Sequence, residues 1–180
     1  MVKKNVNLIG LMLLWTISCL FMQGCKTKSG FIKEPFGEYR SDSVFFRSVG
    51  LGEDMDLQRA KSKAMHNAKV EIARNAQSVC QQVVLDYLNQ TDNNNNINLK
   101  DQFISVSTES VSESLVNVEV EDVIMKKDKN NLYTCYAKVK VQKNNVFDTF
   151  ADRSQDKMNI NAELLKQVID KVVNQINTQQ

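Results

Sequence analysis

A stripe of alanines is the feature that most constrains the fold of this chain. Small and apolar residues recur at steps of three and four along one stretch: Leu57, Ala60, Ala64, Ala68, Ile72, Ala76, Val79, Val83 and Tyr87. These steps place the residues on one face, and they predict a single long helix over residues 55–90. Because the first half of the stripe is nearly all alanine, the helix axis can lie close to whatever it packs on, most simply a sheet.

A short strand and a glycine turn are predicted before this helix. Residues 44–49 are rich in β-formers, which indicates a strand, and Gly50 and Gly52 are expected to turn the chain into the helix. A nucleotide-binding loop is not predicted there. Met55 stands where a dinucleotide loop needs its third glycine, and the Lys-Ser or Lys-Thr pair of a P-loop is missing.

Carboxylates at the start of the helix also argue against a phosphate. Glu53, Asp54 and Asp56 crowd this position, where a phosphate would need hydrogen-bond donors. Acidic groups there complement the helix dipole instead. Asp54 or Asp56 is therefore expected to cap the helix.

The remainder of the central region predicts a loop followed by a hairpin. Residues 91–96 (TDNNNN) end the helix as an exposed loop. Residues 103–125 are interpreted as a long strand with a bulge, and a short helix over 105–114 is the alternative. Residues 126–131 predict a polar hairpin turn, and the strict alternation of residues 132–141 predicts the clearest strand.

The C-terminal region, residues 143–180, is predicted to be a long helix. It carries an apolar seam at steps of four and three, with Ala162 in the same phase: Met158, Leu165, Ile169, Val172 and Ile176. This seam lasts between two and three heptads, which is shorter than a coiled coil needs. Two interpretations stay open, namely packing on the helix's own domain and an interaction seam for a partner or for self-association.

The N-terminal region has the pattern of a bacterial lipoprotein. Residues 1–24 combine a short basic start with an uncharged apolar run, which is typical of a signal peptide. Gly24 then precedes Cys25, as in a lipobox, so Cys25 is the expected lipidation site. A cut before Cys19 and an uncleaved membrane anchor are the alternatives. Residues 25–43 are interpreted as a tether that leads to a domain over residues 44–142. Docking of its aromatic residues Phe31, Phe36 and Tyr39 on the domain is the alternative.

Composition excludes several classes of function. Loss of Lys3 and Lys4 with the signal leaves 21 of the 23 basic residues against 21 acidic ones, and a neutral chain lacks the excess charge of a nucleic-acid-binding protein. No metal site and no cofactor are predicted, because Cys-x-x-Cys is absent and His66 is the only histidine. Cys80 and Cys135 are expected to pack in the core, with a disulfide as the alternative.

Catalysis is not predicted either. His66 lies off the alanine stripe, and the hydroxyl cluster of residues 105–114 has no nearby base to activate it. Glu119 and Glu121 share one strand face, which is expected to face solvent. The prediction is therefore of a protein that is not an enzyme.

Two stretches resemble a known family. The first contains Val-Gly-x-Gly followed by a run of alanines, and its matching positions are Val49, Gly50, Gly52, Asp56, Ala60, Ala64, Ala68 and Ala73. The second, LVNVEVEDVIMKKDKNNLYTCYAKVKV, is similar to the family's closing hairpin. Together they resemble the small Gram-negative lipoproteins typified by the LPP-twenty lipoprotein, to which a module of the flagellar assembly protein FlgT is related. The resemblance covers residues 45–142 and implies an envelope-anchored β-α-β-β module without catalytic residues.

These observations predict an α+β protein, in which a long helix packs on a small antiparallel sheet and a long C-terminal helix follows. The expected function is that of a lipid-anchored, non-catalytic protein-interaction or assembly module. The expected location is the periplasmic face of the outer membrane, since Lys26 rather than Asp follows the lipidated cysteine. The alternatives are an accessory factor of a secretion, flagellar or peptidoglycan-synthesis machine, and a small-ligand carrier.

Replacement of the lipidated cysteine tests the membrane anchor. Cells that express the chain with Cys25→Ala are expected to lose labelling of this protein by radioactive palmitate, because the thiol is the acylated group. The unaltered chain should be labelled in parallel. Equal labelling of both chains would contradict the lipoprotein assignment.

Overall fold

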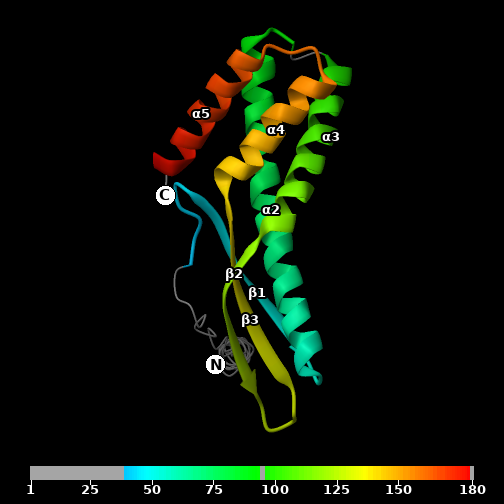
Figure 1. Ribbon diagram of the computed structural model, residues 1–180, viewed down its shortest axis with the longest axis vertical. Helices are drawn as coiled ribbons and strands as arrows, with labels where there is room; N and C mark the ends of the chain where they lie inside the picture. The colour runs from blue at the N-terminus through cyan, green and yellow to red at the C-terminus, as the bar shows by residue number, and fades with distance from the viewer. Residues whose placement is uncertain (1–38, 94–95, 179–180) are drawn as a thin grey trace, which may run out of the picture. The chain divides into compact units, whose positions relative to one another are not determined.

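The computed structural model describes residues 39–93 and 96–178 (Figure 1). The elements in chain order are β1 (Phe45–Asp54), α2 (Leu57–Gln90), α3 (Ile97–Ser114), the 3-10 turn η1 (Leu115–Asn117), β2 (Glu119–Lys127), β3 (Tyr133–Gln142), α4 (Lys143–Lys157) and α5 (Ala162–Thr178). The predicted α+β class, with a long helix after the first strand, is confirmed. Residues 1–24, Cys25 and most of the predicted tether lie outside the described residues.

The three strands form one antiparallel sheet in the order β1-β3-β2. The central strand β3 pairs with β1 on one side and with β2 on the other. Its alternation has the predicted effect, because Cys135, Ala137, Val139 and Val141 are all buried on one face. The first half of α2 packs against that face, over β1 and β3 (Figure 1).

The prediction of a glycine turn is wrong, because Gly50 and Gly52 lie inside β1. A Cβ atom on Gly50 would lie 2.0 Å from the carbonyl oxygen of Ala64, and one on Gly52 would lie 2.2 Å from that of Ala60. The two glycines therefore let the strand touch the backbone of α2 directly. Ser48, one step earlier on this face, donates a hydrogen bond of 2.6 Å to the carbonyl oxygen of Ala68.

The interpretation of residues 103–125 as one long strand is also wrong. Residues 97–114 form helix α3, which is longer than the alternative helix over 105–114, and β2 begins only at Glu119. The apolar side chains of α3 are too few to mark a helical face, because serines occupy much of its buried stripe: Phe103, Val106, Ser107, Ser110, Val111 and Ser114. Ser110 and Ser114 donate to the carbonyl oxygens four residues before them, so their hydroxyls can be buried at little cost.

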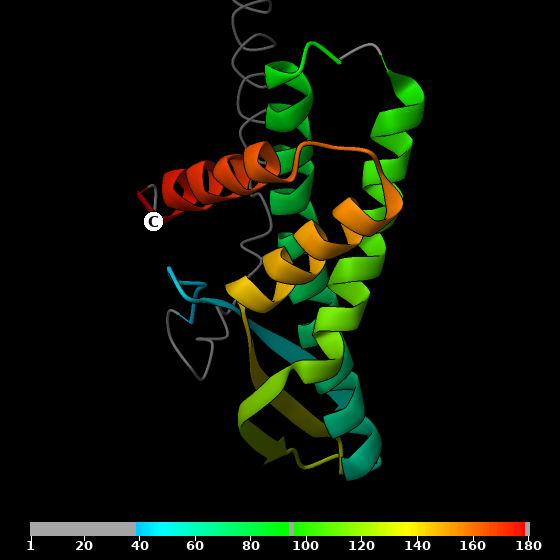
Figure 2. The same ribbon diagram turned by 45° about the horizontal axis from the view of Figure 1, so that its top comes forward.

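A helical core surrounds the second half of α2. Helices α3, α4 and α5 gather around it (Figures 1 and 2), and Phe103, Phe150 and Leu165 are among its fully buried side chains. Tyr87 and Phe103 stack edge to face in this core, with ring centroids 5.4 Å apart. The main apolar core of the domain therefore lies at the helical end.

The C-terminal region consists of two helices rather than one. Helix α4 ends at Lys157, and α5 begins at Ala162 after a short extended break. The predicted seam points into the protein's own core: Met158, Leu165, Ile169 and Val172 are buried, and Ile176 is half-buried against the same cluster. This arrangement matches the interpretation in which the helix packs on its own domain.

Cys80 and Cys135 are both free and fully buried. They belong to different clusters, since Cys80 lies in the helical core and Cys135 lies between the sheet and the alanines of α2. The predicted core packing of the two cysteines is confirmed.

Substitution of Gly50 tests the contact between strand and helix. Gly50→Ala is expected to lower the free energy of unfolding by about 3 kcal/mol, because the new methyl group meets backbone atoms that cannot give way. Thermal denaturation followed by circular dichroism measures this change. Leu51→Thr, at an exposed position of the same strand, is the control and should cost less than about 0.5 kcal/mol. Equal melting temperatures for Gly50→Ala and the unaltered chain would contradict the contact.

Candidate interaction surface

Strand β2 is the least covered of the three strands. It forms one edge of the sheet and packs on β3, while α2 lies over β1 and β3. None of its nine residues is buried. Apolar side chains are therefore left in solvent, with Val120 41% and Met125 51% exposed. The outer edge of β2 carries backbone groups that no other described strand pairs.

Charge is distributed unevenly along β2. Its first half carries Glu119, Glu121 and Asp122, and its last two residues are Lys126 and Lys127. Residues 123–125 between them are apolar. The strand thus runs from an acidic end through an apolar centre to a basic end.

The segment before β1 docks on the sheet face that α2 leaves open. The hydroxyl group of Tyr39 donates to Glu121 Oε2 at 2.5 Å and reaches the carbonyl oxygen of Val139 at 3.3 Å. The Tyr39 ring lies beneath the Lys138 ammonium, 4.3 Å from its centroid, and near the Arg47 guanidinium. Tyr39 therefore crosses the sheet and fixes the position of Glu121 on β2.

A side-chain-capped turn leads from Tyr39 into β1. One carboxylate oxygen of Asp42 accepts hydrogen bonds from the backbone N–H groups of Val44 and Phe45, at 2.8 and 2.7 Å. Arg47 forms an ion pair with the same aspartate. The docking of Tyr39 matches the alternative that the sequence leaves open for the end of the predicted tether, and residues 39–43 belong to the domain.

Hydrogen bonding and burial reinforce the ordinary protonation states of this surface. The Tyr39 hydroxyl, and after it the Lys140 ammonium at 2.9 Å, hold the pKa of Glu121 below its ordinary value of 4.5. Burial, and then the same carboxylate, raise the pKa of Tyr39. Glu121 is therefore ionised and Tyr39 is neutral at any physiological pH.

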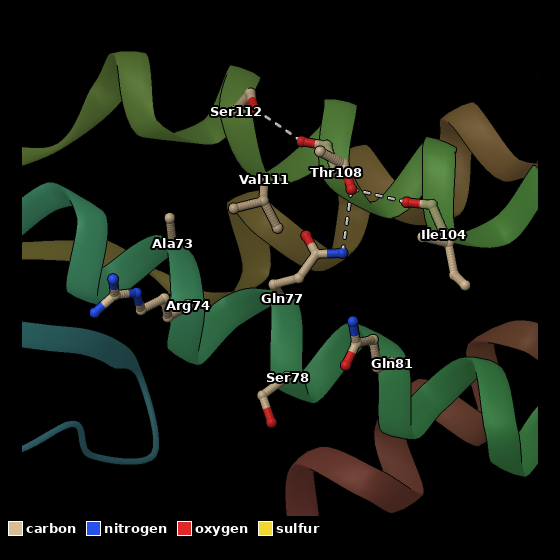
Figure 3. A pocket seen from close by; sticks show the side chains of 9 residues that line it. All are labelled: Ala73, Arg74, Gln77, Ser78, Gln81, Ile104, Thr108, Val111 and Ser112. Atoms are coloured by element: carbon tan, nitrogen blue, oxygen red, sulfur yellow. Dashed lines mark hydrogen bonds between the residues drawn. The ribbon is translucent and has the colours of Figure 1, made fainter. Parts of the chain in front are cut away.

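A groove of about 520 Å³ lies between α2 and α3 (Figure 3). Its walls include Ala73, Ile104 and Val111, but Gln77 crosses from one helix to the other. The Gln77 amide donates to Ser107 at 2.8 Å and to Thr108 at 3.2 Å. The groove is thus divided by hydrogen bonds of the protein itself.

The potential nucleophiles of this region are hydrogen-bonded to the backbone or buried. His66 is exposed on α2, as expected. Ser107, Ser110 and Ser114 donate to backbone carbonyl oxygens, and burial raises the pKa of Cys80 to about 12, which leaves its thiol neutral. Within residues 39–93 and 96–178, no three His, Cys, Asp or Glu side chains are grouped as metal ligands.

One feature of this surface has a signal in the sequence, and another does not. The order of acidic, apolar and basic residues can be read in EVEDVIMKK. The docking of Tyr39 has no local signal, because its partner Glu121 lies 82 positions away.

Comparison of the chain with protein-family models, curated proteins and solved structures finds no match in any of the three. Among the described helices, none combines the length and apolar character needed to cross a membrane.

Removal of one hydroxyl tests the link between Tyr39 and β2. Tyr39→Phe is expected to raise the pKa of Glu121 toward 4.5, because the first cause of its low value is lost. A pH titration of the glutamate side chains by NMR measures the shift. Glu109, whose pKa is lowered by Lys157 on the helical part of the domain, is the internal control and should not change.

Stability should follow the same linkage. Because the folded pKa of Glu121 lies below its unfolded value, its ionised form stabilises the fold above pH 4.5 or so, and this contribution is lost as the pH falls through the lowered pKa. Tyr39→Phe should therefore reduce the loss of melting temperature between pH 7 and pH 3. An unchanged Glu121 titration would show that the hydroxyl does not act on this carboxylate.

Proposed function

We propose that this chain is a lipid-anchored, non-catalytic protein-interaction module of the Gram-negative cell envelope, and that β2 is the surface it presents. The observation that carries the proposal is that no residue of β2 is buried, and that the apolar side chains of Val120 and Met125 are 41% and 51% exposed. The lipobox pattern at Cys25 supports the anchor and the outer-membrane location.

An exposed edge strand is suited to binding another protein. Its unpaired N–H and C=O groups supply affinity when a second strand adds to the sheet, and the side chains on either face supply specificity. Tyr39 and Lys140 hold Glu121 in a fixed position on this strand. Less ordering of the binding surface is therefore needed when a partner arrives.

The resemblance to LPP-twenty-type lipoproteins gives the wider context of the proposal. It favours a structural or assembly role, such as an accessory factor of a secretion, flagellar or peptidoglycan-synthesis machine. A small-ligand carrier has less support, since the groove between α2 and α3 is crossed by the hydrogen bonds of Gln77. Interaction through β2 is the function that we retain.

Site-specific photo-crosslinking in living cells tests this proposal. A photoreactive amino acid in place of Met125 in the full-length chain is expected to give a discrete covalent adduct with a protein, because this exposed side chain lies on the presented strand. The same group in place of Ile97, which is 72% exposed at the start of α3, is the control. Absence of an adduct at Met125, or the same adduct from both positions, would overturn the proposal.

A further inference from the structure

We infer that the partner of β2 is a second copy of this chain, bound by antiparallel pairing of the two β2 strands about a two-fold axis. The inference rests on the proposed function, because it names the occupant of the same edge. The two open-edged sheets would then join into one continuous sheet, with the strand order β1-β3-β2 mirrored on the far side of the axis.

The charge pattern of β2 is complementary to itself in one orientation. When two such strands run antiparallel, the acidic end of each lies opposite the basic end of the other. Because the two chains are related by a two-fold axis, the contact between an acidic end and a basic end occurs twice in the interface. A parallel arrangement would place acidic end against acidic end, which is unfavourable.

The apolar centre of β2 would meet its own copy at the axis. Val123 and Met125 share the face that α2 covers elsewhere, since they pair with Ala137 and Cys135 of that face. Ile124 points to the opposite face beside Tyr136. Met125, which is 51% exposed in a single chain, and the partly buried Val123 and Ile124 would therefore gain apolar neighbours on both faces of the joined sheet.

The lateral approach to β2 is open in the described part of the chain. Tyr39 lies over the sheet face and contacts Glu121 from that side, which leaves the edge itself uncovered. A bulge between Val120 and Asp122, and a hydrogen bond of 2.8 Å from the Val123 N–H to the Asp122 side chain, occupy part of the edge. Bulges and side-chain hydrogen bonds of this kind also protect the edges of monomeric sheets. The experiment therefore changes the charges at the two ends of β2, which distinguish pairing with a second copy from a protected edge.

Charge reversal at the two ends of β2 tests the inference. The acid-reversed chain carries Glu119→Lys with Asp122→Lys, and the base-reversed chain carries Lys126→Glu with Lys127→Glu. Glu121 is left unchanged because it holds Tyr39. Full-length chains with two different epitope tags are co-expressed, and co-precipitation from detergent-solubilised membranes measures self-association.

Unaltered chains are expected to co-precipitate, and each reversed chain should lose this self-association about tenfold or more, because like charges then meet at both ends. Acid-reversed and base-reversed chains that are co-expressed should regain it, since their charges complement each other. This rescue also shows that both variants are folded. Glu71→Lys with Asp101→Lys, at exposed positions of α2 and α3, is the matched control and should behave as the unaltered chain.

Three results would overturn the inference: no co-precipitation of unaltered chains, undiminished self-association of the reversed chains, or no recovery in the mixed pair. Different results would overturn the second-copy inference and the proposed function. A Met125 adduct with a different protein, together with no self-association, would overturn the second-copy inference and leave the proposed function standing. Absence of any adduct at Met125 would overturn the proposed function itself.

Discussion

Direct contact between the backbone of β1 and the backbone of α2 is the constraint on which the rest of the structure depends. Gly50 and Gly52 meet the carbonyl oxygens of Ala64 and Ala60 at distances that leave no room for a Cβ atom. The positions of α2 that meet these glycines most closely are correspondingly alanines, namely Ala60, Ala64 and Ala68. The close approach fixes the height of the helix above β1 and β3. Strand β2 lies at the edge of the sheet beyond this contact, and none of its residues is buried.

Helix α2 joins two cores of different character. Its 34 residues extend over about 51 Å at 1.5 Å per residue. The first half packs through small side chains on the sheet, and the second half packs through aromatic and branched side chains in the helical core.

A buried lysine links two of the helices in the helical core. The ammonium of Lys143 donates to Asn177 Oδ1 at 3.0 Å and ties the start of α4 to the end of α5. Burial lowers the pKa of this lysine, so its charge is held at a cost to stability.

The elements with strict hydrophobic periodicity could be predicted from the sequence, and the others could not. Helix α2 and strand β3 were both recognisable because their buried positions are apolar. Helix α3 was mistaken for a strand because serines that bond to their own helix fill its buried stripe. The glycines of β1 were mistaken for a turn because the sequence does not reveal how close another backbone comes. The order of charges along β2 can be predicted from its own residues. The exposure of β2 cannot, because it depends on which strands α2 covers.

The docking of Tyr39 has a consequence for the reach of the domain. If Cys25 carries the lipid, as proposed, residues 25–38 rather than residues 25–43 separate it from the first docked residue, because Tyr39 is held on the sheet by Glu121 and Lys138. Fully stretched, that segment covers roughly 50 Å at 3.3–3.6 Å per residue. Two neighbouring copies anchored within that span would meet at high local concentration in the plane of the bilayer.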